Sequence, residues 1–222
     1  MFKMEEKNMK NNKKWIIVGI LFLVAIVYTL CVKYVDVGKI GPESSEVGFQ
    51  SINKAFIDSV GYQENWYKIT KYLGYIPFLF VAFYGFIGLK QLIEKKSIQK
   101  VDKKLIFLGL FYILVGITYI FFEKVIINYR PVILEEGLEA SYPSSHTMLA
   151  LTIALSSIMI QNDYIKNEFL GKMLKIGTIL LLLILVVGRT LSGVHWITDI
   201  IGGIIISFLL VSVYKACIQD NR

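Results

Sequence analysis

Two short stretches of the chain hold most of its rare ionisable residue types. They are YRPVILEEGLEASYPSSH (129–146) and GRTLSGVHWITD (188–199). The chain has two histidines, His146 and His195, and both lie here together with Arg130, Arg189 and Asp199. An imidazole can serve as a base, an acid or a nucleophile, and a guanidinium group binds anionic oxygen atoms through a planar fork of N–H donors. The pattern therefore indicates a site that binds an oxygen-rich anion and performs chemistry on it.

His195 and Asp199 have the spacing of a base and its partner. Residues four apart share one face of a helix, so the carboxylate can accept a hydrogen bond from one imidazole nitrogen. That contact fixes the tautomer and leaves the other nitrogen with a lone pair. A lone pair aimed at a phosphorus atom makes His195 the candidate nucleophile, and His146 is then the candidate acid for the leaving oxygen. Such a pair is also a common plain helix contact, so the prediction depends on the two stretches meeting in space.

The string PSSH predicts the start of a helix, with Ser144 and Ser145 in its first turn. Helix N-termini direct free N–H groups and the positive end of the helix dipole outward, so they bind phosphate. We therefore expect Ser144, Ser145, Arg130 and Arg189 to hold a phosphate group.

Membrane-spanning helices must position these residues. The chain is 55% apolar, above the roughly 45–50% of soluble domains, and several apolar runs are long enough to cross a bilayer. We predict an all-α, polytopic membrane protein of one domain (1–222), built as a six-helix transmembrane bundle with an interfacial helix on the outer surface. The spans are predicted at about 15–32, 72–92, 105–122, 145–160, 173–188 and 197–217.

The outer helix is predicted within 42–61, where serines can cap it and four apolar residues recur at helical spacing. The tyrosines and Trp66 that follow are typical of an interfacial belt.

The basic residues set the predicted orientation. With the N-terminus inside, 16 of the 24 lysines and arginines fall on the cytoplasmic side, as the positive-inside rule requires. Both termini are then cytoplasmic, and both histidines meet at the extracytoplasmic face of the plasma membrane. The net charge of +7 arises from lysines between apolar runs, so we expect no nucleic acid partner.

These residues resemble the signatures of the type-2 phosphatidic acid phosphatase superfamily. RTLSGVHWITD matches its third signature, PSSH is similar to its second (P-S-G-H), and the Arg-Pro pair at 130–131 is similar to the end of its first. The resemblance implies metal-independent hydrolysis of lipid phosphate esters or diphosphates through a phosphohistidine. It implies that His195 is the nucleophile, Asp199 its partner and His146 the acid. It also implies that Arg130, Arg189 and Ser144 bind the phosphate.

Three residues depart from the family pattern. The lysine of the first signature falls at Glu123, whereas Lys124 stands one place later, about 100° around a helix. Lys124 remains a candidate phosphate ligand. Ser145 replaces a glycine and can add a donor or narrow the pocket, and Gly188 replaces a serine and so removes a hydroxyl group. None of the three removes the nucleophile or the acid.

We therefore expect a bacterial plasma-membrane lipid phosphatase without a metal or other cofactor. Candidate substrates are phosphatidic acid, lysophosphatidic acid, phosphatidylglycerol phosphate and undecaprenyl diphosphate, and the sequence does not rank them. Two alternatives stay open: a lipid phosphotransferase with the same intermediate, and a non-catalytic transporter or lipid-binding membrane protein. The expected partners are the lipid phosphate and membrane lipids; the oligomeric state is left open.

Overall fold

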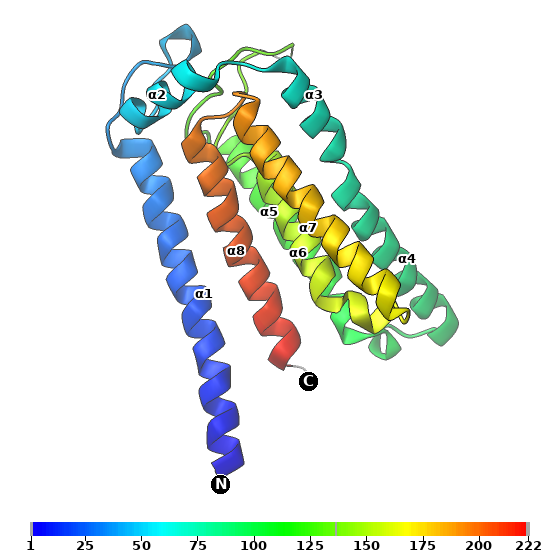
Figure 1. Ribbon diagram of the computed structural model, residues 1–222. Coiled ribbons are helices and arrows are strands. Elements are labelled where there is room, and N and C mark those ends of the chain that lie inside the picture. Colours follow the sequence, from blue (N-terminus) through cyan, green and yellow to red (C-terminus); the bar gives the residue numbers. More distant parts are fainter. Residues whose placement is uncertain (1, 136, 221–222) are drawn as a thin grey trace.

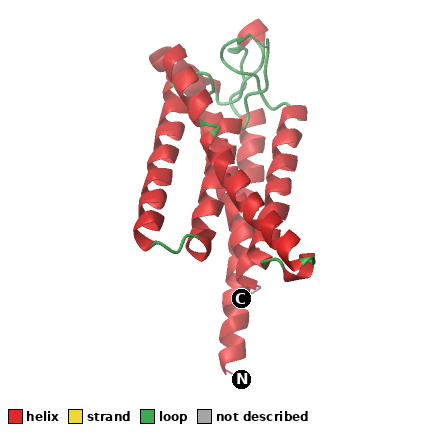
Figure 2. Cartoon of the chain, turned by 90° about the vertical axis from the view of Figure 1, so that its right-hand side faces the viewer, coloured by secondary structure: helices red, strands yellow, loops and turns green. Residues whose placement is uncertain are grey.

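The computed structural model describes residues 2–135 and 137–220, and nearly all regular structure in them is helical (Figure 2). Two short 3-10 helices cover Pro42–Ser44 and Ile98–Lys100. The α-helices are α1 (Phe2–Tyr34), α2 (Gln50–Val60), α3 (Glu64–Leu73), α4 (Ile76–Lys95), α5 (Lys103–Lys124), α6 (Ser145–Tyr164), α7 (Glu168–Leu191) and α8 (Ile197–Asp220). The predicted all-α architecture is confirmed.

Helix α6 lies at the centre of the bundle, packed against α4, α5, α7 and α8, while α1 packs on the far side of α8. Both termini lie at one end of the molecule, and α2 and the longest loops lie at the other (Figures 1 and 2). We call these the terminal end and the loop end. The two predicted chemical stretches both reach the loop end.

Five helical segments among the described residues are long and apolar enough to cross a membrane. They are Asn12–Tyr34, Glu64–Lys95 (α3 with α4), Lys103–Lys124, Glu168–Leu191 and Ile197–Gln219. The predicted six-span count is therefore not confirmed, because α6 is not among them. Its buried faces carry Thr152, Ser156, Ser157 and Gln161, which lower its mean hydropathy; the surrounding helices, rather than lipid, cover these side chains.

The helix on the loop end is shorter than predicted and starts later. Residues 42–48 form a turn closed by the bridge between Gly38 and Val47, and the serines there do not cap α2. Its N-cap is Phe49, in a left-handed conformation with φ 48°. Asn53 anchors α2 instead: it is fully buried and its side-chain amide donates to the Gly48 carbonyl (2.8 Å) and to Thr198 Oγ1 (3.0 Å) at the start of α8.

The aromatic stretch after α2 is a helix that packs on the bundle. Helix α3 lies against α7, where Gly188 permits the contact, and its C-cap Gly74 lies against His146 of α6. A Cβ on Gly188 would lie 2.6 Å from Thr70 Cγ2, and a Cβ on Gly74 would lie 2.8 Å from His146 Cδ2. The segment predicted as an interfacial belt therefore also contacts His146.

Candidate active site

The turn between α7 and α8 positions three of the predicted residues. Arg189 ends α7, His195 lies in the turn, and Asp199 lies in the first turn of α8. Gly193 has φ +60°, and a Cβ there would lie 1.9 Å from the Gly61 carbonyl oxygen. Only glycine fits this close approach, which brings the turn under the α2–α3 connection.

The loop between α5 and α6 folds back on itself and brings a second set of residues to the same place. Arg130 N–H donates to the Glu139 carbonyl (3.1 Å), and Ser141 N–H donates to the Asn128 carbonyl (3.0 Å). The Ser144 N–H then donates to the Asp199 carbonyl (3.0 Å), which joins the start of α6 to the start of α8. The two stretches thus meet, as the sequence predicted.

Arg189 lies between the two histidines and is fully buried. Its Nη2 is 3.2 Å from His146 Nδ1 and 3.4 Å from His195 Nε2. Arginine can only donate, so each imidazole directs a lone pair at this one guanidinium group. A group that takes the place of the Nη2 nitrogen would touch both histidines.

Asp199 does not bond directly to His195, in contrast to the predicted pair. Because α8 begins at Ile197, His195 lies ahead of the helix, and its Nδ1 is 3.9 Å from Asp199 Oδ2. The carboxylate instead accepts from Asn128 Nδ2 (2.9 Å), the Trp196 N–H (3.0 Å) and the Ser141 hydroxyl (2.5 Å). Ser141 Oγ is also 3.0 Å from His195 Nδ1.

The N-terminus of α6 faces the same region. The first intrahelical bond runs from Met148 N–H to the Ser144 carbonyl, so the amides of residues 145–147 precede the helical hydrogen-bond ladder, as at other helix starts. Ser144 is buried, with its hydroxyl 3.1 Å from Thr147 Oγ1. Ser145 is half-buried and lines a small separate cavity with Glu123 and Tyr142. Of the two serines, Ser144 is therefore the closer match to a phosphate ligand.

The other two predicted cations differ in their surroundings. Arg130 is 9% exposed and forms an ion pair with Glu139 (Nη2 to Oε2, 2.8 Å), while its Nε has no hydrogen-bond partner among the residues that the structure describes. Lys124 is exposed at the end of α5 and, within the described part of the chain, makes no hydrogen bond or ion pair with the other candidates. The structure therefore brings Arg130 to the site and leaves Lys124 exposed at the end of α5.

Helix α3 supplies contacts that were missing from the predicted site. Thr70 is fully buried with its hydroxyl 3.4 Å from Arg189 Nη1, and the Tyr67 ring centroid lies 5.5 Å from the Arg189 guanidinium carbon. Thr70 thus places a hydroxyl group beside Arg189. The sequence did contain a signal for this contact: Trp66, Thr70 and Gly74 are spaced by four and share one helical face, and the small Thr70 and Gly74 allow another helix to pack closely there.

Burial and nearby positive charges favour the neutral form of His195. Burial is the largest cause that lowers the pKa of His195 well below its usual value, and the positive charges of Arg130 and Arg189 lower it further. A neutral imidazole is the form with a free lone pair, so the surroundings favour the reactive state.

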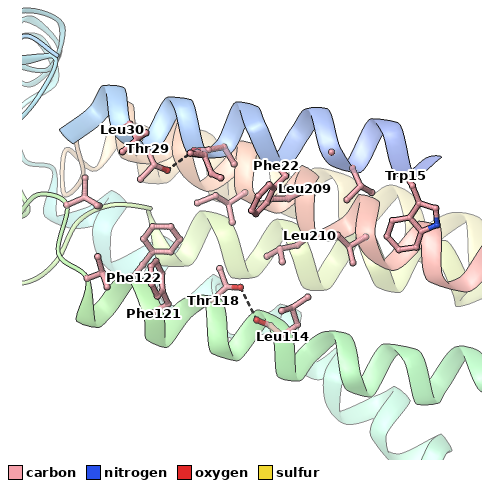
Figure 3. A pocket seen from close by; sticks show the side chains of 18 residues that line it. Trp15, Phe22, Thr29, Leu30, Leu114, Thr118, Phe121, Phe122, Leu209 and Leu210 are labelled. Atoms are coloured by element: carbon pink, nitrogen blue, oxygen red, sulfur yellow. Dashed lines mark hydrogen bonds between the residues drawn. The ribbon is translucent and has the colours of Figure 1, made fainter. Parts of the chain in front are cut away.

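An apolar groove of about 800 Å³ runs along the bundle toward this site (Figure 3). Its walls are side chains of α1, α5 and α8, such as Phe22, Leu114 and Leu210. The hydroxyl of Thr118, which also lines it, bonds to a backbone carbonyl of its own helix. A surface of this kind accommodates hydrocarbon.

The groove reaches the loop that carries the site. Thr29, at its loop end, is 2.7 Å from the Tyr142 hydroxyl, and Phe122 packs edge-on against the Tyr142 ring. Ile127 also lines the groove, and the next residue, Asn128, bonds to Asp199.

Comparisons with known proteins agree with this geometry. A family model described as the PAP2 superfamily matches residues 104–222, more than half of the chain. Among solved structures, the chain is similar to one described as the first transmembrane PAP2 type phosphatidylglycerolphosphate phosphatase, from Bacillus subtilis. The TM-score is 0.60 at 18% sequence identity, over 92% of this chain and 97% of that chain. At this identity the likeness shows a shared fold. No curated protein matched the chain.

Proposed function

Because the chain belongs to the PAP2 superfamily, a family of membrane phosphatases, we propose that it hydrolyses phosphate monoesters or diphosphates of membrane lipids through a phosphohistidine on His195. The meeting of both imidazole lone pairs at the Arg189 guanidinium group carries this proposal. A phosphate held there touches a nucleophile, an acid and a cation at once.

In the first step, the Nε2 lone pair of His195 attacks phosphorus, and the bond from phosphorus to the lipid oxygen breaks. Arg189 turns its donors from the histidines to the phosphate oxygens, where a guanidinium fork makes charge-assisted bonds. Arg130 and the amides at the start of α6, beside Ser144, bind the remaining oxygens.

His146 supplies the proton that the leaving lipid oxygen needs. The negative charge of the bound phosphate stabilises the imidazolium form, which carries a proton on each nitrogen. In the second step, water attacks the phosphohistidine, the phosphorus–nitrogen bond breaks, and His146 takes a proton from the water. Inorganic phosphate leaves, His195 is again neutral, and His146 again carries the proton that it gave to the lipid oxygen; that proton enters from solvent when the phosphate binds and returns to solvent after release. No metal ion takes part in this scheme.

The apolar groove supports a substrate with a hydrocarbon chain. A tail in the groove lies beside Tyr142, two residues before Ser144, so a head group at the end of the tail is near the site. The substrate class therefore includes phosphatidic acid, lysophosphatidic acid, phosphatidylglycerol phosphate and undecaprenyl diphosphate. The name of the similar Bacillus subtilis protein makes phosphatidylglycerol phosphate the first of these to assay.

We place the site at the extracytoplasmic face of a bacterial plasma membrane, with both termini in the cytoplasm. The termini share one end of the bundle, and α2 lies at the other (Figure 1). His146 lies in the first turn of α6 and His195 just before α8, and the lysine bias favours the terminal end as the cytoplasmic one. In this topology α6 is a sixth span, shielded from lipid by its neighbours.

Phosphate release by the purified protein tests the proposal. Wild-type protein in detergent with a chelator should release phosphate from at least one lipid phosphate and, on a radiolabelled substrate, form an acid-labile phosphoenzyme. His195→Ala should abolish both while α-helical content and thermal unfolding stay near wild type. Release that continues in His195→Ala would refute the mechanism. Release only when a second acceptor is present would indicate a phosphotransferase, and binding without release would indicate a non-catalytic lipid-binding protein.

A further inference from the structure

We propose that Ser141 is a positioning residue that sets the tautomer of His195 by linking it to Asp199. This inference deepens the proposed function and rests on it for its catalytic meaning. The observation behind it is separate: Ser141 Oγ lies 3.0 Å from His195 Nδ1 and 2.5 Å from Asp199 Oδ2, whereas the two ionisable groups are 3.9 Å apart.

The donors and acceptors fix the direction of every bond in this chain. Asp199 accepts from Asn128 and from the Trp196 N–H in addition to Ser141, which is the pattern of an ionised carboxylate. A hydroxyl has one proton, and Ser141 gives it to the carboxylate. Its lone pair then faces His195 Nδ1, so that nitrogen must carry the imidazole proton.

The contact on the other side of the ring gives the same answer independently. Arg189 Nη2 lies 3.4 Å from His195 Nε2 and can only donate, so Nε2 must hold the lone pair. Both neighbours therefore select the tautomer with the proton on Nδ1, in which Nε2 is the nucleophile. The other tautomer would place two donors face to face at Arg189.

Burial makes this choice strong. Ser141 is 1% exposed, His195 is 1% exposed and Asp199 is fully buried, so water does not readily replace the hydroxyl. The backbone also holds Ser141 in place, since its N–H donates to the carbonyl of Asn128, whose side chain bonds to the same carboxylate. Without the hydroxyl, the ring has to move by about 1 Å to reach the carboxylate, because a hydrogen bond needs about 2.9 Å.

Nitrogen NMR on labelled histidine tests the assignment directly. The chain has only two histidines, so ¹⁵N-histidine-labelled protein, purified through a tag without histidine, gives two ring systems, and His146→Gln identifies the signals of His195. We expect His195 to be protonated on Nδ1 at neutral pH. Ser141→Ala should raise the share of the tautomer protonated on Nε2, which only Arg189 then opposes, and Ser141→Thr, which keeps the hydroxyl, should restore the wild-type pattern.

Turnover provides the second readout. Ser141→Ala should lower kcat for a lipid phosphate by about tenfold or more, with KM within about twofold and thermal unfolding of Ser141→Thr near wild type. A proton on His195 Nε2 in the wild type, or a Ser141→Ala variant with unchanged tautomer and kcat, would overturn the inference. The NMR result does not depend on turnover. A protein without phosphatase activity would refute the proposed function, and the NMR spectra would still test the tautomer assignment.

Discussion

Each end of the bundle has an aspartate at the start of a helix, and the two serve different purposes. Asp102, at the terminal end, is the N-cap of α5: it accepts from the Lys104 N–H (2.9 Å) and from the Tyr164 hydroxyl (2.6 Å) and is partly exposed. Asp199, at the loop end, is fully buried and faces His195 through Ser141.

The neighbouring residues, rather than the carboxylates themselves, distinguish Asp199 from Asp102. Near Asp102 the charged groups pair with each other, as Lys104 Nζ does with Asp163 (2.6 Å). Near Asp199, buried polar atoms without a partner remain among the described residues: Arg130 Nε, Arg189 Nε and Asn128 Oδ1. Buried polar groups are almost always satisfied in a purely structural network, so the loop end has the character of a binding site and the terminal end that of a helix cap.

Replacing each aspartate in turn should give the largest difference between the catalytic role of Asp199 and the capping role of Asp102. Asp199→Asn removes the charge that stabilises a positively charged imidazole and disturbs the Ser141 bond, so kcat should fall by about 10²- to 10⁴-fold. Asp102→Ala should leave kcat within about twofold and lower the free energy of unfolding by about 1 kcal/mol through loss of the cap. Phosphate release and thermal unfolding in detergent measure the two effects. Similar kinetic losses in both variants would mean that the ends are not distinct.

The two histidines should also differ, because only one is a nucleophile in the proposed mechanism. His146→Ala should reduce turnover of a lipid phosphate by about 10²- to 10⁴-fold, since the leaving alkoxide then has no acid. An aryl phosphate with a good leaving group needs little proton donation and should be affected far less. His195→Ala is the control and should abolish both activities. Equal losses on both substrates in His146→Ala would assign His146 to binding rather than to proton transfer.

Two apolar grooves can also be compared; the expected effect on activity is smaller, but each groove offers a matched position for substitution. The groove between α1, α5 and α8 reaches the loop end, whereas a second one of about 550 Å³, lined by Tyr84, Leu92 and Ile98, extends toward the α4–α5 connection. Each contains a glycine with open space around its Cβ position, Gly19 in the first and Gly88 in the second. A Cβ at either position would meet nothing within 4 Å, so a phenylalanine there is a way to occupy part of its groove.

Gly19→Phe should raise KM for a long-chain lipid phosphate about tenfold, since the displacement of two methylenes costs about 1.6 kcal/mol. KM for a dihexanoyl substrate should not change, and Gly88→Phe should leave both values near wild type. Kinetics in mixed micelles with the two chain lengths provide the measurement. A long-chain effect in Gly88→Phe instead would assign the tail to the groove between α4 and α5.

The sequence predicted the helices and the meeting of the two stretches because apolar length and the order of motifs determine both. Asn128 and Ser141 were not predicted: they lie in a loop without periodicity, and their role comes from a backbone pairing across thirteen residues. The start of the last span at 197 was predicted, but His195 was still placed on the same helical face as Asp199, so a direct bond between them was expected. For α3, the aromatic composition fits an interface, and only the contact with Gly188 reveals that the helix also covers Arg189.

The smallest expected effect concerns two lysines near the loop end. Lys124 is exposed at the end of α5, and surface charges contribute little at physiological ionic strength. Lys71 lies on α3, with its ammonium group 5.8 Å from the centre of the Tyr67 ring that also contacts Arg189. Lys124→Ala should therefore change kcat/KM by less than about threefold, and Lys71→Ala should reduce it by about fivefold, since its charge adds to the attraction for the phosphate. The difference in kcat/KM between wild type and Lys71→Ala should be smaller at high salt than at low salt, because salt screens a partly exposed charge. A larger loss in Lys124→Ala would instead restore Lys124 as the counterpart of the lysine in the first family signature, and it would require the end of α5 to turn toward the site when substrate binds.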